Sequence, residues 1–134
     1  MRIEQRPASE IKRIENPIFR KALCVKPGFR YSALKPYCQE IEFITDGFAT
    51  DIDELSLQII EAMTHYNPDE DVLVPTGTGI VNILLGYYIA NKHPGSSIAV
   101  AFFRKEITKY NRQVIPEDYE FYKFHPATTM KLWV

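Results

Sequence analysis

Several sequence features are scarce or missing, and each absence excludes a class of protein. The chain has 134 residues and only two cysteines, Cys24 and Cys38, without a Cys-x-x-Cys spacing. This argues against a disulfide scaffold and predicts two reduced, packed thiols. No apolar run approaches the roughly 20 residues that a membrane-spanning helix needs, and the charged residues 1–4 do not resemble the start of a secretory signal. The sequence therefore predicts a cytoplasmic protein without a membrane partner.

The chain also lacks an excess of charge of either sign and recognisable catalytic motifs. Lys and Arg number 16 and Asp and Glu 17, giving a formal net charge of −1, which argues against nucleic acid as a partner. The three histidines, His65, His93 and His125, lack the spacing of metal ligands. No paired acid and base and no nucleophilic triad is recognisable. We therefore expect no cofactor, no metal site, no catalytic residues and no enzymatic activity.

What is present is an alternation of strand and helix patterns within one domain, residues 1–134. Residues 1–37 are broken by prolines and predict an irregular N-terminal arm, and residues 38–134 predict an α/β core. The fold class predicted is α/β, a small mixed sheet with a parallel βαβαβ core plus an antiparallel hairpin. Strands are expected near 40–45, 71–75, 98–103 and 108–115, and helices near 51–65 and 79–92. Thr50 is the expected N-cap of the helix at 51–65. Residues 21–26 and 120–125 also fit strands.

The expected helix at 79–92 is apolar on nearly every side. Ile80, Val81, Ile83, Leu84, Leu85, Tyr87, Tyr88, Ile89 and Ala90 leave it without a clear polar face. A surface helix normally keeps such a face, so one side should meet the sheet and the other a second subunit or the N-terminal arm. The sequence therefore predicts a homo-oligomer.

One turn carries the candidate binding site. Thr76, Gly77, Thr78 and Gly79 stand where a strand hands over to a helix, and backbone N–H groups at such a point can approach a phosphate. The pattern is Gly-x-Gly-x-x-Asn, with Asn82 where a dinucleotide fingerprint has glycine. A phosphate or nucleotide site competes here with a simple tight turn capped by Thr78.

Ligands of α/β proteins bind beyond the carboxyl ends of the parallel strands. Asp46 and Arg104 follow two other expected strands, so we expect both on the same sheet edge as the glycine turn. Asp46 can accept from a ribose hydroxyl, and Arg104 can pair with a phosphate. Arg30, from the basic N-terminal third, completes the candidate set, although Arg104 also fits a solvated hairpin residue.

The segment from Pro68 to Val114 contains Asp-Val-Leu-Val-Pro-Thr-Gly, an apolar helix, Ala-Val-Ala-Phe-Phe-Arg and then Lys-Tyr. In these features it resembles small α/β proteins of tailed bacteriophages. The resemblance implies a class of oligomeric anti-defence proteins, similar to the Thoeris anti-defence sponges, that sequester nucleotide signals without cleaving them. It assigns no binding residue to a position in this chain.

Two functions follow as hypotheses. The first is non-enzymatic binding or sequestration of a nucleotide-like or phosphorylated small molecule, with a viral anti-defence role in the host cytoplasm. The alternative is a phage structural, assembly or protein-interaction component in which the glycine turn is only a turn.

Overall fold

A computed structural model describes residues 11–28, 31–48, 51–76 and 79–133. Its elements, in chain order, are β1 (Ile11–Ile14), β2 (Phe19–Cys24), η2 (Tyr31–Tyr37), β3 (Cys38–Phe43), α1 (Ile52–Ala62), β4 (Asp71–Val74), α2 (Gly79–Lys92), β5 (Ile98–Arg104), β6 (Ile107–Thr108), β7 (Val114–Ile115), β8 (Asp118–Phe124) and α3 (Pro126–Trp133). The mixed α/β fold predicted from the sequence is confirmed.

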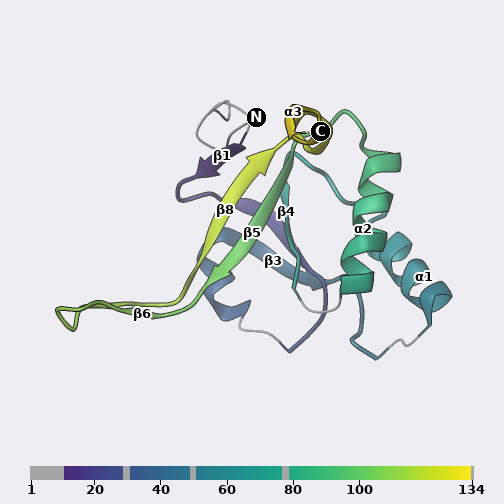
Figure 1. The fold of residues 1–134 in the computed structure, drawn as a ribbon. Helices are drawn as coiled ribbons and strands as arrows, with labels where there is room; N and C mark the ends of the chain where they lie inside the picture. The colour runs from purple at the N-terminus through teal and green to yellow at the C-terminus, as the bar shows by residue number, and fades with distance from the viewer. Residues whose placement is uncertain (1–10, 29–30, 49–50, 77–78, 134) are drawn as a thin grey trace.

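Six strands form one mixed sheet in the order β1-β8-β5-β4-β2-β3 (Figure 1). β3, β2, β4 and β5 are mutually parallel. β8 runs antiparallel to β5 from Ile98 opposite Phe124 to Arg104 opposite Asp118, and β1 runs antiparallel to β8. β6 and β7 form a separate two-stranded sheet.

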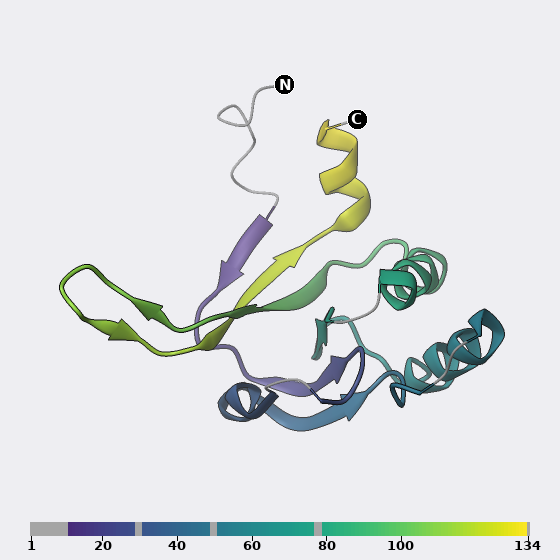
Figure 2. The ribbon, with the colours of Figure 1, turned by 60° about the horizontal axis from the view of Figure 1, so that its bottom comes forward.

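Helices α1 and α2 cover one face of the parallel strands (Figure 2). Each helix buries residues spaced four apart, Leu55 and Ile59 in α1, and Leu85 and Ile89 in α2. That spacing places them on one side of a helix. They pack against residues such as Leu23 on the sheet and form the first core cluster.

The opposite face of the sheet is covered by η2 and by aromatic side chains. The ring of Phe121 on β8 lies 5.5 Å from that of Phe19 and 4.8 Å from that of Tyr37, measured between centroids. Leu34 of η2 is fully buried in this second cluster. The hydroxyl of Tyr37 donates to the Asp118 carboxylate at 3.0 Å, which ties η2 to β8.

The N-terminal third differs from its prediction. Residues 11–37 were expected to belong to an irregular arm, yet they supply β1, η2 and β2, a central strand that lies between β4 and β3. β2 reads Phe-Arg-Lys-Ala-Leu-Cys and its last four residues are fully or nearly buried, as expected for a parallel strand with both faces covered. The possible strand at 21–26 is thereby confirmed.

The predicted strand at 108–115 is wrong. This stretch is the tip of the β6–β7 hairpin, and the antiparallel partner of β5 is β8 instead. The chain turns because the side-chain Oδ1 of Asn111 accepts from the backbone N–H of Gln113 at 3.1 Å and Arg112 has a φ of 67°, both marks of a turn. The possible strand at 120–125 is confirmed as β8.

The expected cap of α1, Thr50, lies outside the described residues. The N-cap is Asp51, whose carboxylate accepts from the backbone N–H of Glu54 at 2.8 Å. Such a cap stabilises a helix by about 1 kcal/mol. Among the described residues, no helix is long and apolar enough to cross a membrane, and the thiols of Cys24 and Cys38 are free.

Candidate functional site

The order of the parallel strands reverses between β2 and β4. The chain moves outward from β2 to β3 through η2 on one face of the sheet, and then returns through α1 to β4 and through α2 to β5 on the other face. Two connections that leave neighbouring strands on opposite faces open a crevice at the carboxyl edge, where open α/β sheets bind ligands. The loops after β2 and β4 therefore flank the candidate site.

Thr76, in the loop after β4, is joined to the loop after β2. The phenol oxygen of Tyr31, the first residue of η2, lies 3.0 Å from Oγ1 of Thr76 and donates to the backbone carbonyl of Lys26. Tyr31 is buried, and this burial raises the pKa of its hydroxyl. The phenol thus stays neutral near pH 7 and fixes the distance between the two loops.

Helix α2 starts at this edge. It begins at Gly79, which is exposed and has open space where a Cβ would stand. The first N–H groups of a helix have no partner inside the helix and carry a partial positive charge. Gly77 and Thr78, two residues of the predicted turn, lie outside the described residues.

Asn82 occupies the first turn of α2. Its side-chain Oδ1 is shielded from solvent and has no hydrogen-bond partner among the residues that the structure describes. A buried acceptor without a donor costs about 1–3 kcal/mol. A ligand hydroxyl or amino group would supply the donor that this oxygen lacks.

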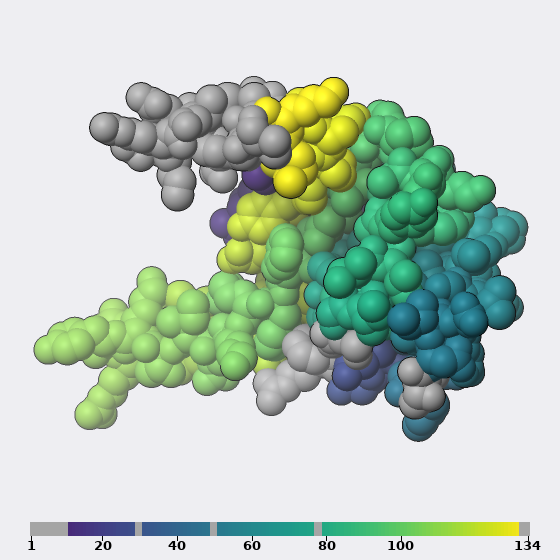
Figure 3. Space-filling model, turned by 45° about the vertical axis from the view of Figure 1, so that its right-hand side comes forward, coloured from purple at the N-terminus to yellow at the C-terminus, as the bar shows by residue number. Residues whose placement is uncertain are grey.

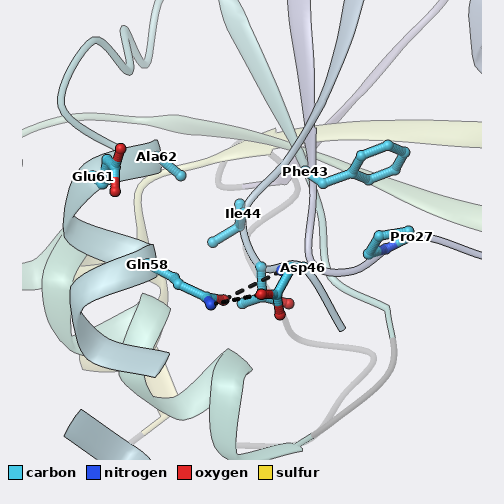
Figure 4. A pocket seen from close by; sticks show the side chains of 8 residues that line it. Pro27, Phe43, Ile44, Asp46, Gln58, Glu61 and Ala62 are labelled. Carbon is cyan, nitrogen blue, oxygen red and sulfur yellow. Dashed lines mark hydrogen bonds between the residues drawn. The ribbon is translucent and has the colours of Figure 1, made fainter. Parts of the chain in front are cut away.

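Asp46 lies further along the same edge, beyond the carboxyl end of β3. Its backbone N–H donates to Oε1 of Gln58 on α1 at 3.2 Å, and its Oδ2 accepts from Nε2 of Gln58 at 3.1 Å (Figure 4). These residues line a pocket of about 470 Å³ together with Pro27, Phe43, Ile44, Thr45, Glu61 and Ala62. The carboxylates of Asp46 and Glu61 make this pocket suited to hydroxyl or amino groups rather than phosphate.

Arg104 is ion-paired on the β8 side of its strand. Its Nε lies 3.5 Å from the carboxylate of Glu120 on β8, the strand on the side of β5 opposite β4. No contact among the described residues joins Arg104 to Thr76 or Gly79. Arg30 lies outside the described part of the chain. The structure thus joins Thr76 with Tyr31 and Asp46 with Gln58, and it pairs Arg104 with Glu120, whose carboxylate also lies 3.9 Å from Arg13.

Two of these residues, Tyr31 and Gln58, were not expected from the sequence. Tyr31 is 45 residues from Thr76 and lies within the proline-interrupted N-terminal third, and Gln58 is an ordinary polar position of α1. No local pattern distinguishes either one, because their role depends on which strands are neighbours in the sheet.

The chemistry available at this edge is hydrogen bonding. His65 and His93 follow the ends of α1 and α2. Since both helices begin at the carboxyl edge, these histidines lie toward the opposite edge. Within the described ranges, no group of three or more His, Cys, Asp or Glu residues is placed to hold a metal ion. The site can hold polar groups, and the described residues offer no paired general acid and base beside it.

No protein-family model matches the chain, and neither the curated proteins nor the solved structures include a match.

Proposed function

We propose that this protein binds a nucleotide-like or phosphorylated small molecule at the carboxyl edge between β2 and β4, without cleaving it. The observation that carries the proposal is the reversal of strand order at β2 and β4, with Tyr31 linking the two loops that flank the crevice. Ligand sites of open α/β sheets form at this position.

The polar groups along the edge support a ligand with two kinds of chemistry. The start of α2 at Gly79 favours an anion such as a phosphate. Among the described residues, Oδ1 of Asn82 is an acceptor without a donor, and the carboxylate of Asp46 is a second acceptor. A nucleotide carries both a phosphate and hydrogen-bond donors on its sugar and base, the two kinds of group that these residues would bind.

The biological role that fits this binding is sequestration of a nucleotide signal by a viral anti-defence protein in the host cytoplasm. Support comes from the resemblance of residues 68–114 to small phage proteins and from the absence of a paired acid and base beside the described part of the site. The free thiols of Cys24 and Cys38 agree with a reducing compartment.

Isothermal titration calorimetry with nucleotides, cyclic dinucleotides and ADP-ribose derivatives tests the proposal. Thr76→Val keeps the shape of the side chain and removes its hydroxyl, and we expect it to weaken binding by about tenfold, the loss of one hydrogen bond. Thr64→Val is the matched control, because the Thr64 hydroxyl donates to the Ile60 carbonyl at the other end of α1. If no member of the panel binds, or if both variants bind equally well, the ligand-binding proposal fails.

A protein-interaction or assembly component is the second candidate, and a specific observation favours it. Helices α1 and α2 expose large apolar side chains on the side that faces away from the sheet, Ile60, Ile83 and Tyr87 among them. Patches of this kind on soluble proteins commonly bind other proteins. The homo-oligomer predicted from the sequence would use this same apolar surface.

A further inference from the structure

The β6–β7 hairpin, residues 105–117, is an arm that projects from the body of the protein. β6 and β7 pair with each other, Ile107 opposite Ile115 and Thr108 opposite Val114. The tip is closed by the backbone N–H of Lys109, which donates to the Gln113 carbonyl at 2.7 Å. Figures 1 and 2 show the arm extending to the side opposite α1 and α2, and Figure 3 shows it as a separate projection.

The surface of the arm combines apolar and cationic side chains. Ile107, Tyr110 and Val114 are exposed, although such residues usually pack against something. Residues 105–117 contain three cations, Lys105, Lys109 and Arg112, and two carboxylates, Glu106 and Glu117, for a net charge of +1. Since the whole chain carries −1, the remaining residues carry −2. The arm is positive and the rest of the chain is negative.

The outer face of α1 and α2 has the complementary composition. Ile83 and Tyr87 on α2 are 69% and 73% exposed, and Leu57 on α1 is 67% exposed. A largely apolar groove of about 630 Å³ runs between the helices, lined by Ser56, Ile59, Ile60, Thr64, Leu84, Tyr87, Tyr88, Asn91 and Lys92. This outer face of α1 and α2 is named the helical face below.

Helix α1, which forms half of the helical face, carries acidic residues. Helix α1 contains Asp53, Glu54 and Glu61, its cap is Asp51, and it has neither Lys nor Arg. Lys92, in the last turn of α2, is the cation that lines the groove, at the end away from Asp51. A positive, partly apolar arm therefore has an acidic, partly apolar counterpart elsewhere on the same chain.

We propose that the arm of one copy docks on the helical face of a second copy. The arm and the helical face lie on opposite sides of the molecule (Figures 1 and 2), so the contact joins different copies. Such a head-to-tail contact uses two different surfaces and builds either a ring or an open chain. Complementary charge guides the approach, and Tyr110, Ile107 and Val114 supply the apolar contact.

A nucleic acid is the other partner that a cationic β-hairpin can take. Affinity for nucleic acid depends mainly on the number of phosphates that cations neutralise. Residues 105–115 hold three cations and three exposed apolar side chains, and the latter have no counterpart along a phosphate backbone. The composition of the arm therefore favours a protein surface.

Two variants of the full-length chain test the docking by sedimentation velocity. Lys109→Glu/Arg112→Glu reverses charge on the arm, and Ile83→Lys/Tyr87→Lys places cations on the helical face. All four positions are on the surface, so both variants should keep the circular dichroism spectrum of the wild type. We expect each variant alone to associate at least about tenfold more weakly than the wild type, because like charges then face each other.

Mixing the two variants is the decisive experiment. The altered arm of the first is attracted to the altered face of the second, and the native arm of the second fits the native face of the first. We therefore expect the mixture to regain association, which also shows that both variants are folded. A wild type that stays monomeric overturns the proposal, as does an oligomer unaffected by the arm variant. A monomer that binds duplex DNA through the arm assigns the arm to nucleic acid instead.

Discussion

Asp71 is the residue whose replacement should tell most about how the sheet is held together. It is the first residue of β4 and is completely buried. Its carboxylate accepts from Nε and Nη2 of Arg20 on β2 at 2.9 and 2.7 Å, and from the backbone N–H of Asn67 at 2.8 Å. Nη2 of Arg20 also donates to the carbonyl of His65 at 2.8 Å. Asp71 thus joins two central strands to the loop that follows α1.

Asp71→Ala removes all three hydrogen bonds at once. Each bond to a charged group contributes about 1.5–3 kcal/mol, but the side chain of Arg20 is partly exposed and can turn to water. The desolvation cost of the buried carboxylate also disappears. The net loss should therefore be about 2–3 kcal/mol, mostly from the Asn67 N–H that loses its acceptor and from the space left beside β2.

Urea denaturation followed by circular dichroism measures this loss. We expect a lower midpoint with an unchanged slope, which indicates lower stability without a different unfolded state. Asp69→Ala is the control, because Asp69 is exposed and only two residues away. It should change stability by less than about 0.5 kcal/mol. If Asp71→Ala costs no more than the control, the ion pair does not stabilise the sheet.

Two further predictions concern ionisation. Burial raises the pKa of Cys24 to about 12 and that of Cys38 to about 11. An alkylating reagent near pH 8 should therefore modify the native thiols far more slowly than those of the urea-unfolded chain. Equal rates of modification, measured by mass spectrometry, would contradict this. Burial also raises the pKa of Tyr66 and Tyr119. Because the folded state then holds protons that the unfolded state has lost, stability should fall as pH rises from about 9 toward 12, and urea midpoints that stay constant over that range would refute the reasoning.

The sequence predicts those elements whose patterns are long and local. The helices at 52–62 and 79–92 and the strands at 71–74 and 98–104 were found because periodicity, caps and the breaks at Pro68 and Pro94 agree with one another. The regular alternation also predicts a parallel core, since such crossovers need a helix between strands. These features depend on neighbours in the sequence.

Sheet neighbours over long separations could not be predicted in the same way. β2 pairs with β4 across some 50 residues, Ala22 opposite Val72, and nothing in a short apolar run shows which strand it will join. The error at 108–115 had a local cause, because Asn111, a typical turn residue, stands in the middle of that stretch. Local sequence patterns therefore predict single elements, whereas the order of the strands in the sheet depends on contacts between distant segments.

In the candidate site, the positions of residues at strand ends could be predicted from the sequence, but their contacts with distant residues could not. Thr76 and Asp46 lie at the carboxyl ends of strands, as predicted from the strand pattern alone. Their contacts, Tyr31 and Gln58, depend on η2 and α1 packing on opposite faces of the sheet. Arg104 was expected on the same sheet edge as the turn because it follows an adjacent strand, and its ion pair with Glu120 depends on β8, whose place beside β5 was not foreseen.

Helix α2 has more apolar side chains than the core of one copy can bury. Its inner side is fully used, because Leu85 and Ile89 are buried against the sheet, so Ile83 and Tyr87 on the outer side add nothing to the core of one copy. The N-terminal third was one candidate to cover them, but residues 11–37 contribute strands to the sheet and η2 on its other face. Within the described chain, the arm is an exposed segment with apolar side chains and opposite charge, and it points away from α2 (Figure 1). An exposed apolar surface of this kind is stabilised when a second molecule removes it from water, so the proposed contact between copies would account for both the outer side of α2 and the arm.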